Sequence, residues 1–194
     1  MGHREDLLEG AKRCLLEKGF LETTARDIVR ESGTNLASIG YHYGSKDALL
    51  AQAYVDLIEN VSLAFDEVPD GDDPTGDGSL ARFERSWENV IRTFTENRST
   101  WRLGLEVMVH ADRLPGVREH LARASGAARS GLVAMFLGGP EPEPTDPLAV
   151  TAGGFYSTLL QGLMVQWFFD PGTTPTGAEL TEGLRQVMAA AERP

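Results

Sequence analysis

One short stretch of the chain combines small side chains with side chains that donate hydrogen bonds: Ala37, Ser38, Gly40, Tyr41, His42 and Lys46. The small residues allow a helix to approach base edges closely. The tyrosine and the histidine can donate to phosphate or stack on sugar, and the lysine adds a charge beside the backbone. These residue types predict contact with duplex DNA, provided that one helix presents them together.

The preceding residues include the capping and helix-ending residues that such a helix needs. Thr24 is expected to cap one helix through its hydroxyl, with Asp27 three residues later reaching back to the cap amide. Gly33 ends that helix because a left-handed residue is cheapest for glycine, and Asn35 caps the next helix near Leu36. The pattern predicts a helix-turn-helix, whose second helix lies in the major groove.

The helices on either side also follow from local patterns. Ser45 is a third cap, and an apolar stripe after it predicts a long helix over residues 46–65. Residues 6–18 carry leucines and alanines at helical spacing and are followed by Gly19. This first helix is expected to brace the other two.

Several short motifs carry a resemblance to a known family: Thr23-Thr24, Ile28, Ser32-Gly33, Ile39, Tyr41-His42-Tyr43 and Ser45-Lys46-Asp47-Ala48-Leu49. With them, residues 4–57 resemble the N-terminal domain of the tetracycline-repressor (TetR) family of one-component regulators. The resemblance implies an all-α protein with a three-helix DNA-binding domain over residues 1–48 and a larger ligand-binding and dimerisation domain over residues 49–194. It also implies a repressor that a small effector releases from a palindromic operator.

The motif and the resemblance together predict ten DNA-binding residues: Thr24, Arg26, Asn35, Leu36, Ala37, Ser38, Gly40, Tyr41, His42 and Lys46. The net charge of −11 is at first sight unfavourable for binding DNA. However, residues 1–50 hold 7 Lys or Arg against 8 Asp or Glu, so most of the acid lies elsewhere. A near-neutral DNA-binding domain gathers few phosphate contacts, and its specificity must come from base contacts and dimer geometry.

The rest of the chain also favours helices. No stretch alternates polar and apolar residues long enough to predict a strand. The acidic segment 66–79 and the proline-rich segment 138–147 are expected to be loops, the first of them a hinge or a mobile loop. A calcium loop in the first segment is not favoured, because Pro74 and Ala81 occupy ligand positions.

Residues 147–169 form a run of 23 without a charge, which is long enough to span a membrane. Small and polar residues recur along it every three or four positions: Thr151, Gly154, Thr158, Gln161 or Gly162, and Gln166. Lipid would not favour such a stripe, whereas a closely packed helix would. Together with residues 177–191, this segment predicts an intersubunit four-helix bundle in a homodimer.

Aromatic side chains and methionines are frequent in the second domain. The resemblance implies an effector pocket among its middle helices, and we expect a largely apolar effector there. Eight residues are predicted to bind it: Trp87, Asn89, Phe94, Trp101, Met108, His110, Phe155 and Gln161.

Other classes of function fit less well. Four histidines and one cysteine, without a nucleophile elbow, a phosphate loop or an HExxH motif, argue against an enzyme, although Glu106 and His110 share a helix face. A helical scaffold would not need the 41–46 motif, whereas a constitutive DNA-binding regulator without a ligand stays open. We expect no cofactor and no metal. Cys14 is expected to be a buried hydrophobe, and the absence of a signal peptide predicts the cytoplasm.

Overall fold

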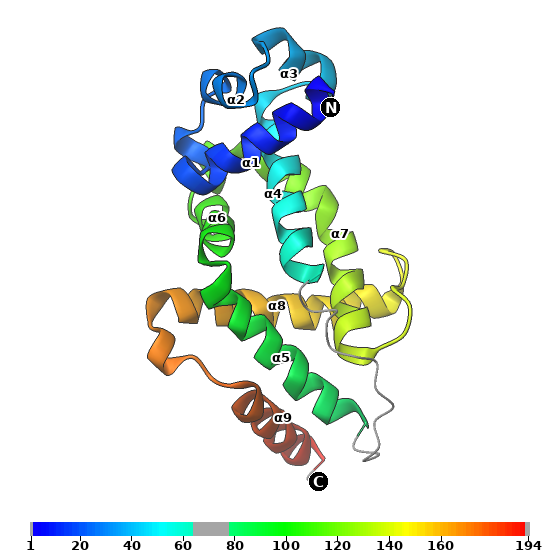
Figure 1. Ribbon diagram of the computed structural model, residues 1–194. Coiled ribbons are helices and arrows are strands. Elements are labelled where there is room, and N and C mark those ends of the chain that lie inside the picture. The colour runs from blue at the N-terminus through cyan, green and yellow to red at the C-terminus, as the bar shows by residue number, and fades with distance from the viewer. Residues whose placement is uncertain (1, 64–77, 193–194) are drawn as a thin grey trace. The chain divides into compact units, whose positions relative to one another are not determined.

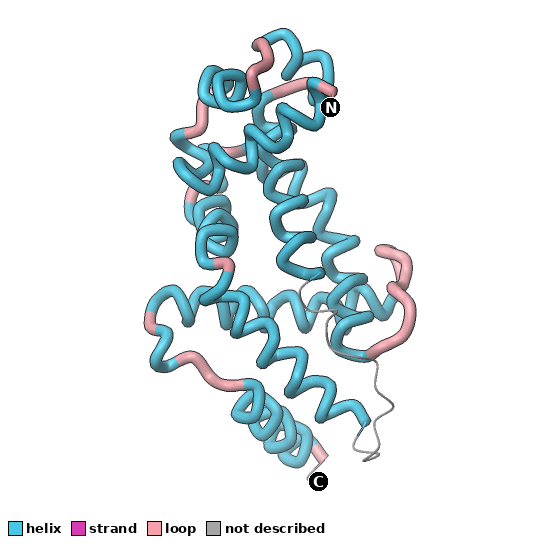
Figure 2. The backbone as a smooth tube through the Cα atoms, viewed as in Figure 1, coloured by secondary structure: helices cyan, strands magenta, loops and turns pink. Residues whose placement is uncertain are grey.

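The computed structural model describes residues 2–63 and 78–192, and helices dominate them (Figures 1 and 2). These residues form nine α-helices and two short 3-10 helices and contain no strand. The predicted all-α fold is therefore confirmed. The helices are α1 (His3–Glu22), α2 (Ala25–Ser32), α3 (Leu36–Tyr43), α4 (Lys46–Leu63), α5 (Gly78–Glu96), α6 (Arg98–Val109), η1 (Ala111–Arg113), α7 (Pro115–Leu137), α8 (Pro147–Phe169), η2 (Pro171–Thr173) and α9 (Gly177–Ala191).

The chain divides into two compact units. Unit 1 comprises Met1–Leu63 and Asn97–Ser125, and unit 2 comprises Ala64–Glu96 and Gly126–Pro194. The two units are defined by which residues contact one another. The predicted boundary after residue 48 instead separates a DNA-binding domain from a ligand-binding domain, and it stays a prediction. The acidic segment falls almost wholly outside the described residues, and so does the hinge or mobile loop expected there.

Unit 1 is built around one apolar core. The largest of its buried side chains come from α1, α2, α4, α6 and α7: Leu7, Leu15, Phe20, Ile28, Leu49, Leu50, Leu103 and Val117. Burying a side chain of this size stabilises the fold by about 1.5–3 kcal/mol relative to leaving it exposed. The core holds the short helices α2 and α3 against the much longer α1 and α4.

A glycine near the end of α1 redirects the chain. Gly19 has φ 80° and ψ −177°, a conformation that is essentially restricted to glycine. The Glu106 carboxylate of α6 lies against Gly19 where a Cβ would stand, and its Oε1 accepts the Leu21 N–H at 2.8 Å. The carboxylate that shares a helix face with His110 is thus engaged with backbone. Among the described residues there is no cluster of three or more potential metal ligands.

Unit 2 has an aromatic core. The ring centroids of Trp87 on α5 and Phe136 on α7 are 4.7 Å apart, and Phe136 stacks on Tyr156 of α8 at 4.3 Å. Helix α9 lies against α5, because Gly177 lets its first turn approach the Glu84 carbonyl oxygen. The middle of α5 and one side of α8 are therefore buried within the unit.

The other side of α8 is exposed. Seven residues at alternating spacings of three and four positions form what we call the α8 stripe: Leu148, Thr151, Phe155, Thr158, Gly162, Val165 and Phe169. Of the small and polar positions predicted to face a partner, all are exposed except the half-buried Gly154. Among the described helices, α8 alone is long and apolar enough to cross a membrane. Of its most apolar stretch of 18 residues, 28% is buried. In a single protomer, α8 thus lacks a cover for its apolar face.

Candidate nucleic-acid interface

Three local caps delimit α2 and the start of α3, as predicted. The Thr24 Oγ1 accepts the Asp27 N–H at 3.1 Å, and the Asp27 Oδ2 accepts the Thr24 N–H at 3.0 Å, which completes a capping box. Gly33 has φ 67° and ends α2 in the left-handed region. The Asn35 Oδ1 accepts the Ser38 N–H at 3.1 Å and so begins α3. The capping box begins α2, and the other two contacts end α2 and begin α3, so together they delimit the helix-turn-helix.

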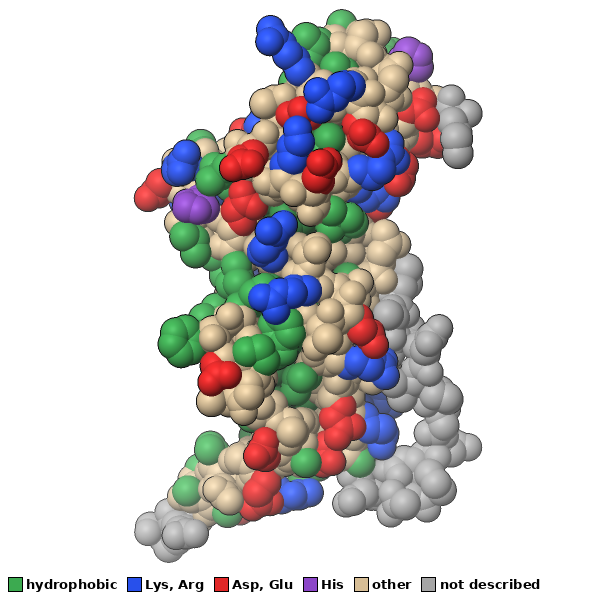
Figure 3. Space-filling view, turned by 60° about the vertical axis from the view of Figure 1, so that its left-hand side comes forward, with side chains coloured by type: hydrophobic (Ala, Val, Ile, Leu, Met, Phe, Trp, Pro, Cys, Tyr) green, Lys and Arg blue, Asp and Glu red, His purple; other side chains and the backbone are tan. Residues whose placement is uncertain are grey.

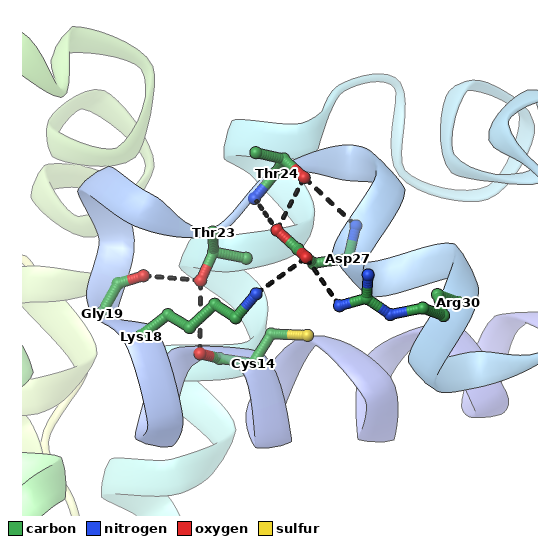
Figure 4. A network of polar contacts seen from close by, with 7 residues as sticks. All are labelled: Cys14, Lys18, Gly19, Thr23, Thr24, Asp27 and Arg30. Atoms are coloured by element: carbon green, nitrogen blue, oxygen red, sulfur yellow. Dashed lines mark hydrogen bonds and ion pairs between the residues drawn. The ribbon is translucent and has the colours of Figure 1, made fainter.

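Asp27 is the centre of a wider polar network (Figure 4). Its Oδ1 lies 2.8 Å from the Lys18 Nζ and also 2.8 Å from an Arg30 guanidinium nitrogen. The hydrogen bond from Lys18 and those from Thr24 hold the pKa of the Asp27 carboxyl well below its usual range. The contact to Lys18 joins α1 to α2, so the network fixes the helix-turn-helix to its bracing helix.

We expect stability to depend on the ionisation of Asp27. Because its pKa is lower in the folded than in the unfolded chain, its stabilising contribution is complete above the unfolded pKa, near 4, and is lost as the pH falls further. Asp27→Asn should therefore lower the melting temperature at pH 7 and differ less from the wild type near pH 3. Circular dichroism melts at both pH values measure this, with Glu17→Gln on α1 as an exposed control. If the melting temperature of Asp27→Asn lies below that of the wild type by the same amount at both pH values, the ionised Asp27 carboxylate does not stabilise the fold as described.

Helix α3 presents one clear outward face. Leu36 is 53% exposed and Tyr41 is 86% exposed, and Ala37 and Gly40 lie on the same face between them. Ile39 turns into the unit 1 core with 4% exposed. Four of the predicted DNA-binding residues thus form a small, uncharged surface with a tyrosine at its edge.

The other predicted DNA contacts have different surroundings. Arg26 and Thr24 are exposed on and before α2, while His42 is half-buried and its ring lies 4.8 Å from that of Tyr41. Ser38 is only 8% exposed. The Lys46 Nζ donates to the Thr23 carbonyl oxygen at 3.1 Å. These contacts also give Ser38 and Lys46 roles in the architecture of unit 1.

Two residues that flank α3 were not predicted from the sequence. The His3 Nδ1 lies 3.5 Å from the Ser38 Oγ, and the Arg4 guanidinium lies 5.7 Å from the centre of the Tyr43 ring. The Tyr43 hydroxyl also donates to the Arg4 carbonyl oxygen at 2.7 Å. The start of α1 therefore contacts α3 at Ser38 and at Tyr43, and it places the exposed residues His3 and Arg4 beside that helix.

Charges of both signs are mixed on this part of the molecule. On the face shown in Figure 3, basic and acidic side chains are interspersed over the part of unit 1 that contains α1 and α2. This agrees with the near balance of 7 Lys or Arg and 8 Asp or Glu in residues 1–50. A mixed surface of this kind gathers few phosphate contacts, so shape and base contacts must supply the specificity.

The predicted effector residues are distributed over both units. In unit 1, Trp101 is buried and Met108 is 46% exposed. His110 lines a cleft of about 320 Å³ between α1 and α6, together with Arg102 and Glu106. The assignment of Trp101, Met108 and His110 to an effector stays a prediction.

In unit 2, the predicted effector residues differ in burial. Trp87 and Phe94 are fully buried, whereas Phe155 is 49% exposed. Asn89 is half-buried, and the exposed Gln161 donates to the Ser157 hydroxyl at 3.2 Å. Of these five, Trp87 lines a pocket of about 210 Å³ bounded by α5, α8 and the start of α9. The pocket is a concave apolar surface, and its occupation by an effector stays a prediction.

An all-helical chain with an exposed recognition helix on a capped helix-turn-helix defines a class of DNA-binding regulators. Residues 7–53 match the bacterial regulatory proteins of the tetR family, and residues 79–191 match the C-terminal domain of BetI-type transcriptional repressors. The second match alone covers more than half of the chain. The protein therefore belongs to the TetR family of transcriptional regulators, and the predicted resemblance is confirmed. The expectation of a regulator rather than an enzyme is confirmed with it.

Individual relatives agree with this assignment. The HTH-type transcriptional repressor AcnR of Corynebacterium efficiens is 34% identical over 134 residues, which cover 65% of this chain and 68% of the relative. The multidrug binding protein EbrR, solved with proflavin, has a TM-score of 0.64 at 22% identity, over 95% of this chain and 99% of its own. The regulator SCO7518 of Streptomyces coelicolor A3(2) has a TM-score of 0.68 at 19% identity, over 95% of this chain and 97% of its own. The two structures show the shared fold.

Proposed function

We propose that the protein is a homodimeric repressor that binds a palindromic operator in the cytoplasm and leaves it when a small, largely apolar effector binds. The exposed face of α3 carries this proposal most directly. Its small residues, Ala37 and Gly40, allow close approach to base edges, and Tyr41 extends from it toward solvent. The ten predicted DNA-binding residues are proposed on this basis.

A dimer is supported by the exposed apolar surface of unit 2. Four of its large hydrophobic side chains are at least 49% exposed: Phe155 and Val165 on α8, and Val187 and Met188 on α9. Helix α8 has no charged residue over its length. A second copy would bury these side chains and complete a four-helix bundle from α8 and α9 of each protomer.

An effector is supported by the cleft of about 320 Å³ that His110 lines and by the abundance of buried aromatic rings in unit 2. EbrR, of similar fold, is described as a multidrug binding protein and was solved with proflavin. We propose that an effector acts through the residues predicted to bind it, by favouring a dimer whose two α3 helices no longer match successive major grooves.

An effector of this kind should couple to operator DNA reciprocally. A compound that weakens operator affinity must itself bind more weakly, by the same factor, when operator DNA is present, because the coupling free energy is shared. Such coupling is typically about 5- to 150-fold. The three tryptophans, Trp87, Trp101 and Trp167, are all buried and provide a fluorescence signal for titrations of candidate compounds, beginning with proflavin.

Titrations with and without operator duplex measure this coupling, and a duplex of scrambled sequence is the control. A compound that binds with equal affinity in both titrations is not an effector. If every compound that binds behaves so, the alternative function holds, namely a constitutive DNA-binding regulator whose aromatic residues are only core.

A further inference from the structure

The pocket in unit 2 lies at the surface that the α8 stripe forms. Its volume is about 210 Å³, and Trp87, Leu159, Leu163 and Leu180 form most of its apolar lining. Thr158 and Gly162 also line the pocket, and both are exposed members of the α8 stripe. No charged residue lines it. The pocket is therefore an apolar hollow within the face that a second copy is proposed to cover.

Gly162 is the reason for part of this hollow. A Cβ built at Gly162 meets no atom within 4 Å, apart from its own chain neighbours and helix backbone. Every other member of the α8 stripe projects a side chain from the helix. The stripe is thus interrupted by one position at which another helix or side chain can come close.

The same stripe carries a side chain that fits the hollow. Phe155 is 49% exposed and lies seven residues, or two helical turns, before Gly162 on the same face. A closed apolar cavity of about 150 Å³ accommodates benzene. The pocket of about 210 Å³ is therefore large enough for the phenyl ring of Phe155.

Two-fold symmetry turns this pair of features into a specific contact. In a two-fold interface every contact between two different positions occurs twice. If one position of the first protomer contacts another position of the partner, the partner's copy of the first position contacts the second position of the first protomer. If two α8 helices cross antiparallel near Thr158, each Phe155 faces the partner's Gly162. We propose that the partner's Phe155 fills the pocket beside Gly162 and Trp87, twice per dimer. This inference rests on the proposed homodimer. It removes Phe155 and the pocket beside Trp87 from the surface proposed for the effector, and the other predicted effector residues keep that proposed role.

A second copy of this chain fits the pocket better than an unrelated partner. The Phe155 ring and the pocket beside Gly162 both lie on α8. A single contact between two copies of this helix therefore buries the ring and fills the pocket, and no other protein is needed. The 23 residues of α8 carry no charge, and two copies can therefore meet there without like-charge repulsion. Large exposed hydrophobic side chains flank both features, with Val165 on α8 and Met188 on α9 each at least 50% exposed.

Disulfide trapping tests the contact directly. In a Cys14→Ser background, the variant with both Phe155→Cys and Gly162→Cys should form a disulfide-linked dimer on mild oxidation. Each single-cysteine variant should not, because the two copies of either position would lie about 10 Å apart along the helix axis. A disulfide requires Cα atoms within about 7 Å. Denaturing gels without reductant measure the product, and sedimentation of the reduced proteins gives their oligomeric state.

The outcomes separate this inference from the proposed dimer. A dimer-specific crosslink in the double variant alone supports the contact. Reduced proteins that are dimers but do not crosslink through the pair, or that crosslink through Gly162→Cys alone, overturn the contact and leave the dimer standing. A wild-type protein that sediments as a monomer overturns both.

Exchanging the two side chains provides an independent test. Phe155→Ala should weaken dimerisation by about tenfold or more, because a central aromatic anchor is lost. Gly162→Phe should weaken it as well, by filling the hollow in both protomers. The variant with both substitutions should recover most of the affinity, because the shortened side chain at position 155 leaves room for the partner's new ring at position 162. A double variant no tighter than the weaker single variant would overturn the proposed pairing.

Discussion

We expect Thr158→Arg to sediment as a monomer and to lose operator binding. Thr158 is exposed at the centre of the α8 stripe, and its hydroxyl donates to the Gly154 carbonyl oxygen of its own helix. An arginine there would be tolerated in a single protomer but would place an unpaired guanidinium in the dimer interface. Removing one partner of a buried charge pair costs about 3–5 kcal/mol, and a charge buried alone should cost as much, here at two positions. The glutamate of Gly154→Glu should act in the same way.

A matched control separates the interface from unit 2 itself. Thr95→Arg makes the same chemical change at an exposed position on α5 and should leave the dimer and operator binding unchanged. Circular dichroism should show that both variants retain their helix content. A Thr158→Arg protein that stays dimeric and binds operator with wild-type affinity would show that α8 does not form the interface.

The second large effect is expected at the recognition helix. Ala37→Glu should weaken operator binding by at least about a hundredfold, because it places a carboxylate against base edges and phosphates. Ala37 is exposed at the second position of α3, where a negative charge favours the helix. The variant should therefore remain folded and dimeric while it loses DNA affinity.

Fluorescence anisotropy with labelled operator duplex measures the loss. Ala122→Glu on α7 places the same side chain at another exposed helical position of unit 1 and should bind normally. If Ala37→Glu keeps the wild-type affinity while its dimer and its fold are intact, then α3 does not lie in the groove.

The sequence was most informative where a contact joins residues three or four positions apart. The capping box of Thr24 and Asp27 and the Asn35 cap are contacts of this kind, and each was predicted and found. The helices they delimit follow from the same local signals. Helix caps can be predicted because donor, acceptor and spacing all lie within one turn.

Contacts between distant residues could not be predicted in this way. The Lys18 ammonium reaches Asp27 across nine positions, and the Leu21 N–H reaches Glu106 across 85. His3 meets Ser38 across 35 positions. Charge and polarity show that such residues need partners, but nothing in the local pattern says which partners they have.

The apolar residues of the second domain show a further limit. Helical periodicity predicts which side chains share a face, yet Trp87 is fully buried while Phe155 is 49% exposed. The absence of charge on α8 predicted burial against a partner, and the exposed α8 stripe agrees with that need without identifying the partner. Core, interface and effector pocket use the same residue types, so only the packing distinguishes core from surface.

Selection of duplexes from a random DNA pool by the purified protein tests the central claim most directly, because the operator sequence need not be known beforehand. A dimer that places two α3 helices in successive major grooves should recover an inverted repeat whose half-site centres lie about 10 base pairs, or ~34 Å, apart or at a multiple of that distance. The Thr158→Arg and Ala37→Glu proteins should recover no common sequence. Recovery of a single unrepeated site, or of no preferred sequence by the wild-type protein, would contradict the proposal of a homodimeric repressor that reads a palindromic operator.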